Sequence, residues 1–500
     1  MKRILTFIMV LACAVGSAQT ANDVLLFSLE DQQGTARFQG MSGAFGALGG
    51  DMSALNINPA SSAVFNNSIF SITGTHYEKD NATTYGGGFR NMDENRVDLN
   101  QLGGVFVYKN TSDSEWKKIA FAVNYDMVQQ FNNEIAVSGS SAEGIDNYFL
   151  AFAQGVPFGS ILIQGDELIE DAYLDIGARS GFGAQQAFLG YYGGLIDPTD
   201  MDEGTSTYVP TAQYNSVNQE YRQSTSGYNS KFTVNFAGQH EENLFVGASV
   251  NFHTIFYDKA TFLDETGYEA ASPIQSTIFD NLLHTEGSGF SFQLGAIAKV
   301  NESLRLGGSY QSPTWYRLTD DTAQRIDSDL ADDEIGFIDF NVINLFEEYK
   351  IKVPAKYTGS AALIFGRDGL LSFDYSYQDM SNAELQPTTD PSFSIVNDQI
   401  ANSFGDINSF RIGAEYRIDE VSLRGGYRME ESPFADGSTV GDLTGYSLGL
   451  GYSFGGSRLD LGFNQSEREI NMPLFDVGVS TQAFRNLENT QVALTYTLNF

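Results

Sequence analysis

The chain has 500 residues, of which 63 are acidic and 28 basic, so its formal net charge is -35. This sign excludes nucleic acid as a partner, because phosphate binding requires a basic surface. Aromatic residues make up 13% of the chain, with 51 glycines and 11 prolines, and one large β-barrel can absorb this length without division into domains.

Residues 1–18 have the features of a secretory signal peptide. Lys2 and Arg3 precede an apolar run, and Gly-Ser-Ala at residues 16–18 provides a small-residue cleavage site. Lipid attachment at Cys13 is the alternative, which the leucine at position 11 disfavours. Otherwise the only cysteine is removed with the signal, and the mature chain has no disulfide and no thiol metal ligand. No later apolar run approaches the roughly 20 residues of a membrane helix, so an exported, aromatic-rich chain of this kind indicates an outer-membrane barrel.

Residues 40–60 are the first unusual segment of the mature chain. Their closely spaced glycines allow tight turns, and their apolar side chains are too many for a solvated loop, namely Met41, Phe45, Leu48, Met52, Leu55 and Ile57. The segment ends in Asn58-Pro59-Ala60, where Pro59 fixes its own φ and biases Asn58 toward an extended conformation. This composition predicts a compact plug that other parts of the chain surround.

A small-residue, acid-containing segment that ends in Asn58-Pro59-Ala60, ahead of an all-β chain, resembles the hatch of the FadL/TodX family of outer-membrane transporters for hydrophobic compounds. The resemblance covers residues 34–65 in detail and the rest of the chain in layout. It implies that Asn58, Pro59 and Ala60 form the hatch motif. It also implies that a substrate lands at extracellular loops, enters a lumen pocket, and leaves when the hatch or a strand irregularity opens a path.

From residue 69 onward, apolar residues alternate with small or polar ones, as in barrel strands with one face on lipid and one on the lumen. Fourteen strands are predicted, at residues 68–77, 101–109, 117–127, 230–239, 243–257, 286–299, 303–316, 351–365, 369–380, 406–418, 420–430, 441–454, 457–466 and 488–500. Short and long connections alternate, as periplasmic turns and extracellular loops do. An even number of strands places both barrel ends on the periplasmic side. The terminal Phe500 resembles the signal that the barrel assembly machinery recognises, so this machinery is an expected partner.

The longest connection, residues 128–229, is rich in apolar side chains. Phe149, Phe152, Phe188 and Tyr191 belong to stripes and clusters that a solvated loop would not carry. One interpretation is a lid packed on itself. The other is an exposed extracellular groove on which a hydrophobic ligand first lands.

Several arginines are predicted to face the lumen, since charge on the lipid face is costly. Arg411, Arg424 and Arg428 are the candidates for holding an anionic headgroup, because arginine offers a bidentate fork. The alternative is an interior ladder in which arginines and carboxylates such as Glu415 and Asp460 fix the barrel and hold the hatch.

Little in the chain indicates catalysis or a metal. Ser447 and Ser453 match Gly-x-Ser-x-Gly, but strand alternation produces that pattern here, without the strand-turn-helix context of an esterase. The four histidines have no metal-ligand spacing, and the acidic residues 320–334 lack the EF-hand pattern. That acidic loop is predicted to be solvated or to bridge lipopolysaccharide through divalent ions. We expect no enzyme activity, metal or cofactor.

The sequence therefore predicts an all-β protein, a 14-stranded antiparallel transmembrane β-barrel with an N-terminal hatch inside the lumen. Its segments are a signal peptide (1–18), the hatch (19–66) and the barrel with long extracellular loops (67–500). We expect a monomer in the outer membrane of a Gram-negative bacterium, among phospholipid and lipopolysaccharide. The predicted function is passive transport of hydrophobic or amphipathic small molecules that resemble long-chain fatty acids. The alternatives are a shuttle-type barrel of type IX secretion that binds protein cargo, and a general porin.

Overall fold

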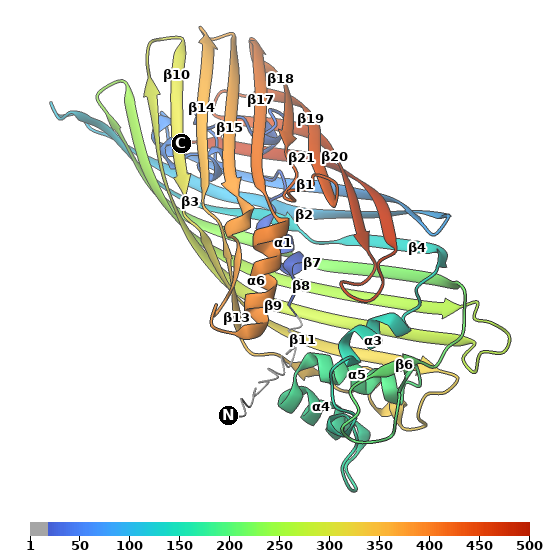
Figure 1. Cartoon of the computed structure of the whole chain (residues 1–500). Coiled ribbons are helices and arrows are strands. Elements are labelled where there is room, and N and C mark those ends of the chain that lie inside the picture. The colour runs from blue at the N-terminus through green and yellow to red at the C-terminus, as the bar shows by residue number, and fades with distance from the viewer. Residues whose placement is uncertain (1–18) are drawn as a thin grey trace, which may run out of the picture.

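The computed structural model describes residues 19–500 (Figure 1). The predicted signal peptide and the alternative use of Cys13 lie outside the described residues. Strands dominate the described chain, and none of its helices is long and apolar enough to cross a membrane.

Alternating side chains build the wall of the molecule. In β19 (Val440–Ser453), Tyr446 and Leu448 face outward and are exposed, whereas the intervening Ser447 is buried. The wall has no open edge, because β1 (Ile69–Tyr85) pairs with β21 (Gln482–Asn499) along almost its whole length. The result is the closed 14-strand antiparallel barrel that the sequence predicts.

All the predicted strands are present. Some of them are divided into two shorter strand segments that follow each other in the chain. Pro313 and Pro354 lie at two of these interruptions, because proline has no N–H for the ladder. The remaining strands are β2 (Gly88–Lys109), β3 (Trp116–Gln130) with β4 (Asn133–Ser141), β7 (Val217–His240), β8 (Leu244–Thr266), β9 (Ser276–Lys299), β10 (Leu304–Gln311) with β11 (Thr314–Ser328), β13 (Tyr349–Val353) with β14 (Lys356–Phe365), β15 (Gly369–Asp379) with β16 (Glu384–Gln386), β17 (Asp406–Ile418), β18 (Val421–Glu430) and β20 (Ser457–Pro473).

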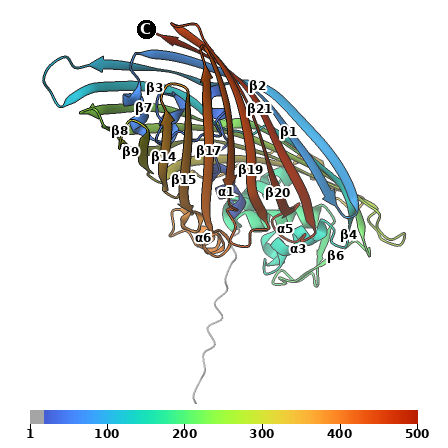
Figure 2. The ribbon, with the colours of Figure 1, turned by 90° about the horizontal axis from the view of Figure 1, so that it is seen from above.

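The two ends of the barrel differ. The Phe500 amide donates to the Ser68 carbonyl at 3.0 Å, so the barrel begins and ends at the rim with short turns. The opposite rim carries the long connections and most of the helices (Figures 1 and 2). Those connections contain α3 (Asp146–Ala153), η3 (Phe158–Ser160), α4 (Ile169–Ser180), α5 (Phe182–Tyr192), β5 (Ile196–Pro198), β6 (Tyr208–Pro210), η4 (Ile335–Phe337), β12 (Asn344–Leu345), η5 (Met380–Asn382) and α6 (Pro391–Ser403). By the usual asymmetry of such barrels, the short-turn rim is periplasmic.

The N-terminal segment runs through the lumen, and we call residues 19–66 the plug. It contains α1 (Ala21–Ser28), α2 (Ala36–Gln39), η1 (Ser53–Asn56) and η2 (Pro59–Val64). Its first described residue, Gln19, donates to Asp320 of β11 at 2.9 Å, near the long-loop rim, whereas Ser68 lies at the short-turn rim. The plug therefore spans much of the height of the barrel.

Candidate functional site

The part of the plug nearest the short-turn rim is packed against the barrel wall. Met41, Phe45 and Leu48 form one buried apolar cluster inside the lumen, with Ala362 of β14. A second cluster joins plug side chains to inward side chains of the wall, and consists of Met52, Leu55, Phe65, Ile69, Val105, Ala120 and Ala122. Because these apolar groups are shielded from water on both sides, the plug and the wall share one core here.

The predicted hatch motif lies against the inner face of β8, β9 and β10. The Asn58 side chain donates to the carbonyls of Gly46 at 2.8 Å and Ala296 at 3.0 Å, and its Oδ1 accepts from the Ala60 amide at 3.1 Å. The Pro59 carbonyl accepts from Asn235 of β7 at 2.9 Å. Asn58 thus caps η2 and ties two plug turns to the wall at once.

Glycines on the wall allow this close approach. A Cβ at Gly247 would lie 2.4 Å from the Pro59 carbonyl oxygen, and a Cβ at Gly307 would lie 2.3 Å from the Gly46 carbonyl oxygen. Both neighbours are backbone atoms that cannot rotate away. Only glycine therefore fits at these wall positions without moving the plug.

A buried ionic network joins the plug to the opposite wall. Arg37 of α2 lies 2.8 Å from Glu415 of β17, and Glu415 lies 2.7 Å from Arg424 of β18. Arg424 also pairs with Asp460 of β20 at 2.8 Å, and Arg458 pairs with Asp460 at 2.6 Å. Burial opposes the charge of Arg37, but the Glu415 carboxylate outweighs it and raises the pKa of Arg37. Removing one member of such a network would leave an uncompensated buried charge.

The three arginines predicted as headgroup candidates all face the lumen, in different settings. The Arg424 side chain is fully buried and engaged by two carboxylates. Arg411 and Arg428 form no salt bridge with any residue in 19–500. Arg411 and Arg428 are direct cross-strand partners on β17 and β18. These two guanidinium groups are therefore not ion-paired, unlike Arg424, although the carboxylates of Glu30 and Asp374 attract Arg411 and that of Glu430 attracts Arg428.

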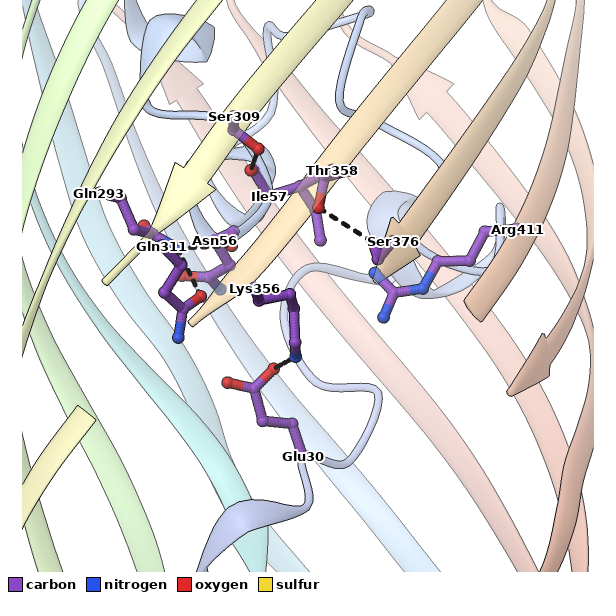
Figure 3. Close-up of a pocket in the computed structure, with 10 residues that line it drawn as sticks. All are labelled: Glu30, Asn56, Ile57, Gln293, Ser309, Gln311, Lys356, Thr358, Ser376 and Arg411. Atoms are coloured by element: carbon purple, nitrogen blue, oxygen red, sulfur yellow. Dashed lines mark hydrogen bonds and ion pairs between the residues drawn. The ribbon is translucent and has the colours of Figure 1, made fainter. Parts of the chain in front are cut away.

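Arg411 lines a cavity between the plug and the wall (Figure 3). It is a small hollow, and the space between atoms there amounts to about 310 Å³ when the open solvent at its mouth is included. Its lining is mostly polar and comprises Glu30, Asn56, Ile57, Gln293, Ser309, Gln311, Lys356, Thr358, Ser376 and Arg411. Lys356 donates to Glu30 at 2.7 Å. Burial disfavours the Glu30 carboxylate, but Lys356, together with Lys231 and Arg411, outweighs burial and lowers the pKa of Glu30 to about 2. Glu30 of the plug is thus paired with Lys356, one of the two cationic residues that line the cavity.

An apolar region lies next to this cavity, around α1. Val24, Leu25 and Phe27 are buried there against lumen-facing side chains, and Phe27 contacts the rings of Phe131 and Tyr257 edge-on, each at 5.9 Å. Further members of the cluster come from β11, β13 and α6, and include Leu318, Ile351, Phe393 and Ile400.

Sequence analysis did not single out α1 or Lys356. The Thr20 amide donates to the Asp23 carboxylate at 2.7 Å, within a capping box that marks the start of the helix. That spacing, followed by the run Val24-Leu25-Leu26-Phe27, is a signal that could have revealed α1.

The long connection between β4 and β7 is folded on itself. Phe149 of α3 and Phe188 of α5 have no exposed surface, because they lie inside the core of the helical cap. Phe152 and Tyr191 are partly buried at its edge. Of the four predicted groove residues, only these two reach the surface of the structure.

The described chain shows no arrangement for metal binding or nucleophilic catalysis at the positions considered. No group of three or more His, Cys, Asp or Glu among residues 19–500 is placed to hold a metal ion. The Ser447 hydroxyl is buried and hydrogen-bonds to the Ser42 hydroxyl of the plug at 2.8 Å. Its role in the structure is a contact between wall and plug.

Comparison with known proteins gives a family match. The model of the family described as outer membrane protein transport protein (OMPP1/FadL/TodX) matches residues 197–492. A Pseudomonas aeruginosa FadL homologue superimposes with a TM-score of 0.55 at 13% identity, over 95% of this chain and 100% of that chain. The CymD monoaromatic hydrocarbon channel gives 0.50 at 13% identity, over 94% and 98%. The Pseudomonas putida toluene transporter TodX gives 0.48 at 13% identity, over 95% and 100%. A comparison with curated proteins gives no match.

Proposed function

The chain belongs to the OMPP1/FadL/TodX family of outer membrane transport proteins, and on this premise we propose that it takes up amphipathic small molecules with an apolar tail and an anionic head. The family is one of transport channels rather than enzymes, in the outer membrane of Gram-negative bacteria. We further propose that residues 19–66 act as the hatch and residues 67–500 as the transmembrane barrel, after removal of residues 1–18.

The observation that carries the proposal is the pairing of an apolar region with cations that form no salt bridge in the described chain. Arg411 lines the polar cavity, and α1, with its buried Val24, Leu25 and Phe27, ends two residues before the cavity residue Glu30. A carboxylate at Arg411 would form charge-assisted hydrogen bonds. A tail of the same molecule would occupy the space among the apolar side chains that α1 now fills.

One feature argues against the porin alternative, and a second bears on the polarity of the substrate. The plug fills the lower lumen and shares a core with the wall, which disfavours a general porin with a permanent aqueous channel. The similar barrels TodX and CymD are a toluene transporter and a monoaromatic hydrocarbon channel. A neutral hydrocarbon would make no use of Arg411 and Arg428, so these guanidinium groups favour an anionic amphiphile for this chain.

The test compares an acid with a neutral analogue of equal chain length. Arg411→Gln should weaken dodecanoate binding about tenfold or more, because a hydrogen bond to a charged group contributes about 1.5 to 3 kcal/mol. Binding of dodecanol should stay unchanged. Both are measured by isothermal titration calorimetry of the full-length protein in detergent. Arg317→Gln, which removes an exposed guanidinium on the outer face of β11, is the matched control. Equal loss for acid and alcohol would show that Arg411 only supports the structure.

A further inference from the structure

Three basic side chains gather at the short-turn rim of the lumen. Lys118 of β3 and Lys299 of β9 lie over the same aromatic ring, that of Phe245 on β8, with their Nζ atoms 5.9 Å and 5.0 Å from its centroid. Arg305 of β10 is the direct cross-strand partner of Lys299. Three strands, β3, β9 and β10, therefore each contribute a cation to one small region of this rim.

These cations form no salt bridge in the described part of the chain, although the carboxylates of Glu242 and Glu302 in the adjacent turns attract the two lysines through solvent. Lys118, Lys299 and Arg305 form no salt bridge with any residue among 19–500, and Lys118 is only 7% exposed. The nearest acidic side chains in the adjacent turns, Glu242 and Glu302, are exposed and form no salt bridge either. In a chain of net charge -35, a group of three cations without a salt bridge is unexpected.

Contacts with the plug account for only part of this positive charge. The Lys118 ammonium donates to the Phe65 carbonyl at 2.7 Å, and the Arg305 guanidinium donates to the Leu48 carbonyl at 2.9 Å. A carbonyl group is neutral, and an ammonium and a guanidinium have further donors. The Lys299 ammonium forms no hydrogen bond or salt bridge with residues 19–500 and lies 5.0 Å from the centroid of the Phe245 ring. Like charges opposite each other on paired strands are destabilising, and a bound anion would relieve that repulsion.

Lys299 and Arg305 lie on two strands that also line the cavity, but nearer the short-turn rim. Gln293 of β9 and Gln311 of β10 line the cavity, and Lys299 and Arg305 follow on the same inner faces toward the short-turn rim. Asn58 of the hatch motif lies between the two levels, against Ala296. A headgroup that passed the hatch motif along β9 and β10 would arrive at these cations.

We propose that Lys118, Lys299 and Arg305 form a second anion site, on the periplasmic side of the plug, which holds the carboxylate or phosphate headgroup of an amphiphile. Two sources could supply this chemistry. One is a transported acid that has passed the plug, which rests on the function proposed above. The other is a phospholipid of the periplasmic leaflet, which does not depend on that function.

Lys299→Gln is the variant of choice, because the Lys299 side chain donates no hydrogen bond to the plug in the described structure. Arg367→Gln removes an exposed charge from another turn of the same rim and serves as the control. Lys299→Arg should restore binding. A heat-modifiable band on gels verifies that each variant is folded.

Native mass spectrometry of the full-length protein, with dodecanoate in one arm and phosphatidylglycerol in the other, gives the readout. We expect Lys299→Gln to weaken binding of at least one of them about tenfold or more, and Arg367→Gln to bind as the wild type does. Loss confined to dodecanoate identifies the transported acid, and loss confined to phosphatidylglycerol identifies the leaflet lipid. Unchanged binding of both would overturn the site. The same measurement on Arg411→Gln separates the two proposals, because the second anion site should persist there.

Discussion

The fit of the plug against glycine makes a sharp test of how the barrel is closed. In Gly307→Ala, the added Cβ would lie 2.3 Å from the Gly46 carbonyl oxygen and 2.9 Å from its carbon. The neighbouring Gly308 faces outward, and a Cβ there meets nothing within 4 Å. The two substitutions are chemically identical and adjacent on β10, so they differ only in contact with the plug.

The expected magnitude follows from the backbone nature of the contact. Gly46 cannot rotate away, and its amide is already held by the Asp374 carboxylate of β15 at 3.0 Å. Overpacking of this kind costs about 1 to 3 kcal/mol. That cost would multiply the population of the displaced plug by a factor of about 5 to 150.

Single-channel recording in planar bilayers measures this population directly. Gly307→Ala should open more often than the wild type by about that factor, and Gly308→Ala should remain closed. Cells that express Gly307→Ala should also become more susceptible to vancomycin. If both variants stay closed although both barrels are heat-modifiable, close backbone approach does not hold the plug in place.

Three further predictions concern the plug and the C-terminus. Deleting residues 22–60 should leave a barrel that assembles but conducts strongly and admits bulky antibiotics, and unchanged conductance would remove the plug from its assigned role. Deleting Phe500 should lower the heat-modifiable fraction without altering the conductance of assembled molecules. Burial, with Asp476 nearby, raises the pKa of Asp23 in α1 to about 6, so docking of α1 favours the protonated form and should weaken as pH rises to about 6. Hydrogen exchange of α1, corrected for the intrinsic rate, should show this loss between the ordinary carboxyl pKa of 3.8 and about 6, with no further change at higher pH, and Asp23→Asn should abolish the loss.

The sequence predicted every strand of the barrel, but not the height of several. The apolar and small residues of β19 alternate over its length, and the predicted and observed bounds nearly agree. β7, by contrast, begins at Val217, well before the predicted residue 230. Its early part is rich in polar residues on both faces, because it lies above the lipid, where outward side chains meet water. The alternation of apolar and polar residues indicates the part of a strand that contacts lipid, and it is lost where the strand extends beyond the membrane.

The sequence allowed the lumen-facing orientation of the arginines to be predicted, but not the residues with which they form ion pairs. Alternation along β17 and β18 places Glu415 and Arg424 in the lumen, as the sequence predicts. The fact that Arg37 completes their network depends on a contact between residues 378 positions apart. Spacing within a strand carries no information about what the plug brings to it. For the same reason, the sequence could not distinguish the ion-paired Arg424 from Arg411, which is not ion-paired within residues 19–500.

The path of the N-terminal segment imposes an order on assembly. Its contacts reach the last strand, where the Ala36 amide donates to Thr495 at 2.7 Å, and its start reaches Asp320 far up the lumen. A segment with helices and a packed core cannot be threaded through a finished cylinder. β1 and β21 must therefore pair around the plug, so that the barrel closes on a segment that is already inside it. Because contacts of such long sequence separation form slowly, we expect the pairing of β1 with β21 to be the last step in closing the barrel.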